Sequence, residues 1–227
     1  MVTVLSLGGS IVAPDAPDAA FLSSFSTLVR EWLSADNSRK LIIVVGGGGP
    51  ARSYQKAFSA ICPGGSHEQA DWIGIMATRL NAQLLKAVFA DICPTDVVYD
   101  PTKIDVFTGR ILVAAGWKPG FSTDNDAVLL AERFSADTVI NLSNIAKVYT
   151  DDPRANPEAK PIDSISWADF RKIVGDEWIP GKNVPFDPVA SMHAQNAGLR
   201  VICAAGRDID NLRAILDGKD FIGSVIS

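Results

Sequence analysis

A glycine-rich turn at residues 41–58 (LIIVVGGGGPARSYQKAF) is the first candidate site. Its apolar start predicts a buried strand, and Pro50 suits the first turn of a helix because the N–H that it lacks would have no partner there. A strand, a glycine turn and a helix N-terminus together form an anion site. Arg52 adds a positive charge that suits a bound phosphate. A tight connection without a ligand is the alternative for this stretch taken alone.

Three further turns rich in glycine or small residues follow predicted strands. They are GGS at 8–10, GWKPGFSTD at 116–124 and LSNIAKVYTDDP at 142–153. Parallel strands bring their carboxyl ends to one edge of a sheet, and ligands bind outside that edge. Four such turns predict binding of more than one phosphate, and therefore a phosphoryl donor beside an acceptor.

A dinucleotide-binding turn is a weaker interpretation of the same glycines. The pattern Gly46-x-Gly48-x-x-Ala51 formally matches the fingerprint. That fold places an acidic residue at the end of the next strand, about 20 residues on. Glu68 and Asp71 lie at this distance but open a predicted helix. This disagreement argues against an oxidoreductase.

Several other chemistries lack their motifs. The sequence has no G-x-x-x-x-G-K-[ST] loop, no H-E-x-x-H pair, no G-x-S-x-G turn and no C-x-x-C pair. His67 and His193 are expected to be structural. The three cysteines, at 62, 93 and 203, lie far apart and are predicted to be reduced, mostly buried thiols.

The elements that must position these turns alternate between strand and helix. Such alternation predicts a three-layer αβα sandwich around a mostly parallel sheet. Strands are expected at 2–7, 41–45, 111–115, 138–142, 199–204 and 223–226, and helices after Asp18, from Pro50, and at 68–90, 123–134, 187–197 and 208–216. Residues 95–110 receive no clear assignment, and 150–165 read as a surface excursion because of their prolines. In helix 68–90 the inward face is predicted to hold Ile73, Met76, Ala77, Leu80, Leu84 and Val88.

Length and charge limit the possible functions. The 227 residues form one expected domain, 1–227, with a net charge of −5. This acidic balance, without a basic run, argues against nucleic-acid binding. No apolar stretch reaches the length of a membrane span, and the N-terminus has no signal-peptide pattern. A soluble, cytoplasmic protein is therefore expected.

Five motifs, taken in order, carry a resemblance to a known family. They are the GGS turn, VVGGGGPAR, DWIGIMATRLNA, PGFSTDNDAVLLAE and VYTDDPRANPEAKPI. Together they resemble the amino acid kinase family, and within it the archaeal-type UMP kinases, from residue 2 to the final GSVI. The resemblance implies an αβα sandwich whose N-terminal half binds the phosphoryl acceptor and whose C-terminal half binds ATP. It also implies a homo-oligomer, either a dimer or a hexamer built as a trimer of dimers.

The resemblance implies roles for individual residues. UMP would be bound by Gly47, Gly48, Arg52, Asp71 and Thr123. ATP would be bound by Gly8, Gly9, Ser10, Ser143, Asn144, Tyr149, Asp152 and Pro153. The catalytic residues would be Asp124, Lys118 and Ser10, with Mg²⁺ carried by ATP and no metal ligand from protein side chains. Arg79 matches a family arginine but reads equally well as a solvated helix residue, Tyr149 as a packing residue, and Asp124 as a helix cap.

The chain also departs from the family pattern. Most members have a lysine two residues before the GGS turn, where this chain has Ser6. A second lysine, usual just before the Asp187 segment, is replaced by Val184. The missing charge could come from Lys118, Lys147 or Lys182, each of which is also readily explained as a surface lysine. The departures leave a non-catalytic or molybdate/tungstate-storage relative that binds ATP as the alternative to a UMP kinase.

Overall fold

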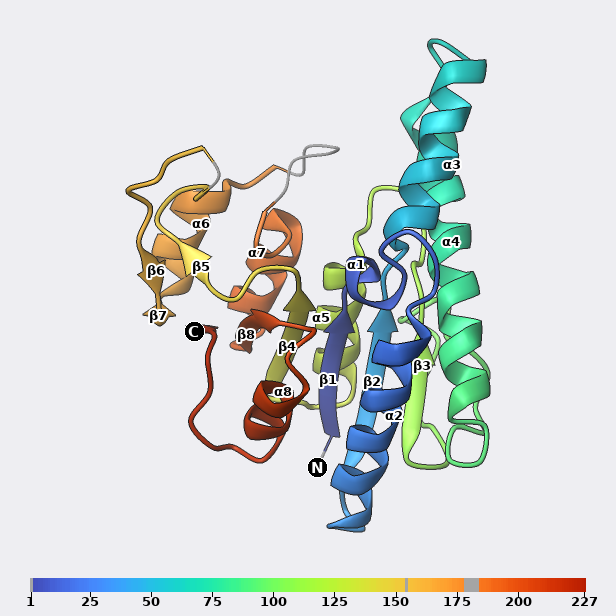
Figure 1. The fold of residues 1–227 in the computed structure, drawn as a ribbon, viewed down its shortest axis with the longest axis vertical. Helices are drawn as coiled ribbons and strands as arrows, with labels where there is room; N and C mark the ends of the chain where they lie inside the picture. The colour runs from blue at the N-terminus through green and yellow to red at the C-terminus, as the bar shows by residue number, and fades with distance from the viewer. Residues whose placement is uncertain (1, 154, 178–183) are drawn as a thin grey trace.

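A seven-stranded sheet forms the centre of the molecule, in the order β3-β2-β1-β4-β8-β9-β7 (Figure 1). The computed structural model describes residues 2–153, 155–177 and 184–227. Five strands are mutually parallel: β1 (Val2–Leu7), β2 (Lys40–Val45), β3 (Ile111–Ala114), β4 (Thr138–Ser143) and β8 (Arg200–Ala205). β9 (Ser224–Ile226) runs antiparallel to β8 and pairs with β7 (Ser164–Ile165). β5 (Val148–Tyr149) and β6 (Pro161–Ile162) form a separate antiparallel pair.

Helices cover both faces of this sheet. The elements are α1 (Gly9–Val12), α2 (Ala19–Ser34), α3 (Gly48–Ile61), α4 (His67–Val88), α5 (Thr123–Arg133), α6 (Trp167–Val174), α7 (Pro188–Asn196) and α8 (Ile209–Leu216). One core cluster joins the sheet to α1, α2, α4 and α8, and a second joins it to α5, α6 and α7. The predicted αβα sandwich is confirmed.

Alternation within the strands explains the two cores. In β1, Leu5 and Leu7 pack into the first cluster while Val4 packs into the second. Neighbouring β2 divides its apolar run in the same way, with Ile43 on one face and Ile42 on the other. Because successive strand side chains point to opposite faces, a strand covered on both sides needs a continuous apolar run. These runs are what made the strands predictable.

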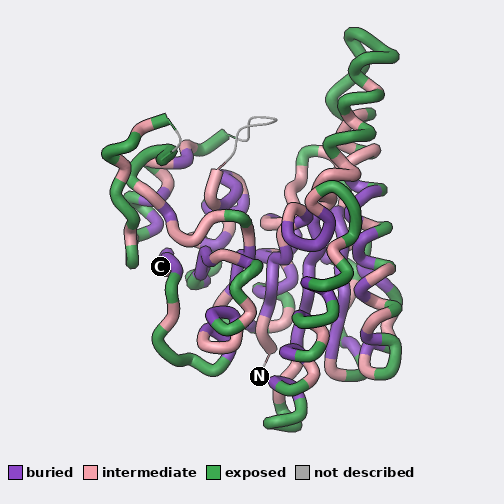
Figure 2. Tube along the Cα trace, viewed as in Figure 1, coloured by how far each residue is buried: buried purple, intermediate pink, exposed green. Residues whose placement is uncertain are grey.

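The predicted inward face of α4 was wrong at two positions. Met76 is 58% exposed and Leu80 is 70% exposed, whereas Ile75, Ala82 and Leu85 are buried. Met76 and Leu80 lie on the helix face opposite the buried residues Ile75, Thr78 and Ala82, so the inward face is rotated from the predicted one. Figures 1 and 2 also show that the first turns of α4 project beyond the sheet together with α3. Only the later turns of α4 pack on the sheet.

Residues 150–165 carry more structure than expected. Besides surface turns they contain β6 and β7, and α6 follows directly after them. Strands of two residues are too short to show a period, which is why the pattern gave no signal. Within the described residues, no helix combines the length and the apolarity that a membrane span needs.

Candidate functional site

Two glycine turns touch each other through their backbones at the carboxyl ends of β1 and β2. A Cβ on Gly9 would lie 2.0 Å from the Gly48 nitrogen, and a Cβ on Gly46 would lie 2.4 Å from the Gly9 nitrogen. Gly48 also has a φ of +66°, a conformation that glycine adopts readily. Glycine is therefore needed at these positions because a side chain on one turn would clash with the backbone of the other turn. The sequence alone did not reveal this contact.

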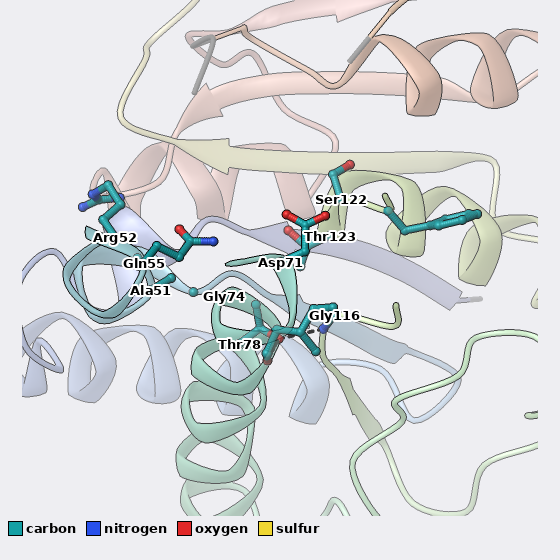
Figure 3. Close-up of a pocket in the computed structure, with 13 residues that line it drawn as sticks. Ala51, Arg52, Gln55, Asp71, Gly74, Thr78, Gly116, Ser122 and Thr123 are labelled. Atoms are coloured by element: carbon teal, nitrogen blue, oxygen red, sulfur yellow. Dashed lines mark hydrogen bonds between the residues drawn. The ribbon is translucent and has the colours of Figure 1, made fainter. Parts of the chain in front are cut away.

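A cavity of about 300 Å³ opens beside the second glycine turn. Figure 3 shows it between α3, α4 and the start of α5. All five residues predicted to bind the acceptor line this cavity: Gly47, Gly48, Arg52, Asp71 and Thr123. Gln55, Thr78 and Phe121 line it as well. The individual roles of the five remain predictions, but the fold brings them to one space from three separate segments: the second glycine turn with the start of α3, helix α4, and the start of α5.

Three elements hold the walls of this cavity. Helix α3 begins at Gly48, two residues before the expected Pro50, and carries Arg52 on its second turn, where Nη2 donates to the Pro14 carbonyl at 3.2 Å. On α4, the Asp71 carboxylate accepts from the Gly120 N–H at 3.0 Å. The Thr78 hydroxyl accepts from the Gly116 N–H at 2.8 Å. Both contacts tie the 116–122 loop to α4.

Asp124 lies at the start of α5 but does not cap it. The cap is Ser122, whose Oγ accepts from the Asn125 N–H, so the capping interpretation of Asp124 was wrong. Instead, Asp124 Oδ1 accepts from the Ser6 hydroxyl at 2.9 Å, and Oδ2 accepts from the Asp187 N–H at 3.2 Å. Burial raises the pKa of Asp124 to about 6, and the nearby Asp187 carboxylate adds to the rise.

Ser6 occupies the position where the resemblance predicts a lysine. It is 1% exposed, on β1, and its hydroxyl donates to Asp124. Among the described residues, no ion pair includes Asp124 or Asp187. The Ser6 hydroxyl thus orients the Asp124 carboxylate but supplies no positive charge to balance it. A cation that binds together with a ligand would supply that charge.

Ser6→Ala is expected to move the acid limb of the turnover–pH profile upward by about one pH unit. The hydrogen bond from Ser6 lowers the pKa of Asp124, so its loss raises that pKa further. More of the carboxyl is then protonated near neutral pH, and turnover recovers as the pH rises. The measurement is kcat between pH 5 and 9. Ser224→Ala, which removes another buried hydroxyl, bonded to the Val148 N–H, is the matched control. An unmoved acid limb would contradict the prediction.

Neither of the two candidate lysines that the structure describes, Lys118 and Lys147, forms an ion pair with Asp124. Lys118 is exposed and its Nζ lies 3.9 Å from the centre of the Trp117 ring and 4.7 Å from that of Phe121. Lys147, which precedes β5, is paired with Asp163, which follows β6. Lys182 lies outside the described residues. Of the two that are described, Lys118 lies beside the acceptor cavity through Phe121, which lines it.

Arg79 does not line the acceptor cavity, and it is not a free surface group. Its Nη2 donates to the Trp117 carbonyl at 3.0 Å, and its guanidinium lies over the Tyr99 ring at 4.4 Å. Arg79 therefore ties the 116–122 loop to α4. His193 is likewise structural, because its Nδ1 pairs with Asn125 Oδ1 at 2.7 Å.

The residues predicted to bind ATP are spread over two regions. Gly8 lies against β4, since its N–H donates to the Leu142 carbonyl at 2.9 Å, which brings the turn at 8–10 next to Ser143. Exposed Asn144 follows, Tyr149 belongs to β5, and Asp152 and Pro153 lie in the exposed turn after it. A second cavity, of about 420 Å³, is lined by Asp163 and residues of the 219–225 segment, and none of the predicted ATP residues lines it.

Two buried polar residues near the site were missed at the sequence level. Asn81 Nδ2 donates to the Gly46 and Gly47 carbonyls at 2.8 and 3.2 Å. Asp126 accepts from the Trp117 N–H at 3.2 Å, and burial raises its pKa to about 7. A polar residue at an inward position of a helix was the available signal, and each helix buries a second polar residue beside it, Thr78 in α4 and Asn125 in α5.

The sequence model of the family described as "Amino acid kinase family" matches residues 1–205. The chain belongs to the amino acid kinase family. One relative of this chain is the uridylate kinase of Methanospirillum hungatei. It is 36% identical over 230 residues, and the match covers 99% of this chain and 94% of that protein. The uridylate kinase of Pyrococcus abyssi is 33% identical, covering 96% of each chain.

A solved structure shows the same amino acid kinase architecture. The crystal structure of uridylate kinase from Archaeoglobus fulgidus superimposes with a TM-score of 0.85 at 31% identity, and the match covers 100% of both chains. A UMP kinase structure from Bacillus anthracis, at 19% identity and a TM-score of 0.77, shares the fold. The likeness therefore extends over the whole chain, including the part beyond residue 205.

Proposed function

We propose that this amino acid kinase is a UMP kinase, which transfers the γ-phosphoryl group of ATP to UMP and gives UDP for pyrimidine nucleotide synthesis. The observation that carries the proposal is the acceptor cavity. One space collects a glycine turn, an arginine and a carboxylate, at Gly47 and Gly48, Arg52 and Asp71. Backbone N–H groups and an arginine suit a phosphate, and a carboxylate suits ribose hydroxyls. The relatives described above are all named as uridylate kinases, which favours this function over oxyanion storage.

The proposed mechanism is alignment with charge neutralisation. Phosphoryl transfer needs little covalent help from a protein. UMP would be held in the acceptor cavity and ATP along the turn at 8–10, with Ser10 beside the transferring group. Asp124 and Asp187 bring two carboxylates together without a cation partner among the described residues, and their negative charge suits an Mg²⁺ that ATP carries rather than one held by protein side chains. That ion would neutralise charge on the transferring phosphoryl oxygens.

The proposed reaction is tested by a coupled ADP-release assay with purified protein. We expect ATP turnover that depends on UMP and on magnesium, with less or no turnover on CMP, dUMP or without an acceptor. Calorimetry with UMP alone provides the binding control. Tight binding of molybdate or tungstate together with ATP, without UMP binding, would replace the kinase by the storage alternative.

We propose that the chain works as one domain, 1–227, in a cytoplasmic homo-oligomer, a dimer or a hexamer built from dimers. Exposed apolar residues on the α3–α4 projection support this assembly: Tyr54 and Ile61 on α3, and Trp72, Met76 and Leu80 at four-residue spacing along one face of α4. Figure 2 shows this projection standing clear of the sheet. Exposed apolar residues gathered on one helix face are typical of an interface. Leu80→Glu should lower the mass measured by light scattering in solution.

A further inference from the structure

Asn81 is buried within α4, directly below the second glycine turn. It is 3% exposed, and its single side-chain nitrogen donates to two successive backbone carbonyls, those of Gly46 at 2.8 Å and Gly47 at 3.2 Å. Only the amide nitrogen can face two carbonyl oxygens, because the amide oxygen would repel both. The side chain therefore has one orientation at this position.

These two carbonyls belong to the peptide groups that carry the Gly47 and Gly48 N–H groups. No described peptide bond is cis, and in a trans peptide the N–H points opposite to the C=O. A carbonyl held towards Asn81 thus turns its N–H away from α4. Both residues line the acceptor cavity with Arg52.

The flanking N–H groups of the same turn are already used. Gly46 donates to the Leu7 carbonyl at 3.0 Å, and Gly49 donates to the Ala13 carbonyl at 2.8 Å. For the Gly47 and Gly48 N–H groups, the described part of the chain supplies no acceptor. The turn therefore keeps two adjacent donors for a ligand, and a cavity that admits an anion lies beside them.

We propose that Asn81 is a positioning residue that aims the Gly47 and Gly48 N–H groups at the phosphate of the acceptor. The inference rests on the proposed function and deepens it, because it separates recognition of the phosphate from recognition of the nucleoside. Asn81 itself touches no substrate. It acts through two peptide groups, in the way that outer partners orient the groups that bind a ligand directly.

The experiment compares UMP with uridine, which lacks only the phosphate, by equilibrium binding to the full chain. In Asn81→Leu, which keeps a similar volume without a donor, we expect UMP affinity to fall at least roughly tenfold. Uridine affinity and the KM for ATP should stay within about twofold. Asn81→Asp, which keeps the shape and places a carboxylate against two carbonyls, gives the same comparison should the leucine variant fold poorly.

Asn211→Leu provides the matched control. Asn211 is also buried and holds Ile222 through two hydrogen bonds of 2.7 Å, in the α8–β9 connection. Its loss should lower the melting temperature but leave the ratio of UMP to uridine affinity unchanged. Equal losses of UMP and uridine binding in the Asn81 variants, or no loss of either, would overturn the inference. A wild-type protein that binds UMP no better than uridine would instead overturn the proposed function.

Discussion

Asp124→Asn is expected to lower turnover at least about 100-fold, a barrier increase of ~2.7 kcal/mol, while the protein still folds and binds both nucleotides. The carboxylate accepts from Ser6 Oγ and the Asp187 N–H, so its two oxygens are fixed at the meeting point of β1, α5 and α7. Asparagine keeps the size and one acceptor but removes the charge. Because Ser122 caps α5, the substitution leaves the helix start intact.

Asp208→Asn is the control for this variant. Asp208 caps α8 through the Asn211 N–H at 2.9 Å, and asparagine caps as well as aspartate does, so turnover should not change. Rapid-quench kinetics at saturating ATP and UMP would measure the chemical step directly. Near-normal turnover in the Asp124 variant would show that its charge takes no part in the transfer.

Arg52→Ala is expected to weaken UMP binding roughly 10- to 150-fold, which corresponds to the ~1.5–3 kcal/mol of a charge-assisted hydrogen bond. Arg52 is exposed at the mouth of the acceptor cavity, and among the described residues its side chain hydrogen-bonds only to the Pro14 carbonyl. The melting temperature of the free protein should therefore change little. Arg52→Lys should recover only part of the affinity, because an ammonium group cannot form the planar two-point contact of a guanidinium with phosphate.

Lys56→Ala, on the next turn of the same helix, controls for the general charge of α3. Lys56 is exposed and does not line the cavity, so its loss should leave UMP affinity nearly unchanged. Titration calorimetry with UMP gives both values. A large drop in stability of the Arg52→Ala protein with unaltered UMP affinity would assign Arg52 to the fold rather than to the ligand.

Strands and turns were predictable from the sequence because their signals are local. The buried runs of β1 and β2 are continuous in apolar residues, and each is followed by glycines. The resemblance also named five residues that the structure brings together around one cavity, and their roles in binding the acceptor stay predictions. The three cysteines are free, and two of them are buried, as expected.

Contacts between distant segments were not predictable in the same way. Ser6 and Asp124 are 118 residues apart, and nothing local indicates that a hydroxyl on β1 meets a carboxylate on α5. The exposed face of α4 was missed for a related reason, because helical period identifies an apolar face but not whether the sheet or another surface covers it. Asn81 belongs to the motif DWIGIMATRLNA, but its role depends on hydrogen bonds to the Gly46 and Gly47 carbonyls, which the sequence does not indicate.

The backbone contact between the two glycine turns sets the geometry of the proposed reaction. Gly9 and Gly48 approach so closely that neither can carry a side chain. The spacing between the two turns is thus set by the main chain, and in the proposed reaction it would fix the distance between the donor turn and the acceptor turn without help from a side chain. Ser6 illustrates this separation: its hydroxyl on β1 bonds to Asp124, while the backbone contact between the two turns involves no side chain.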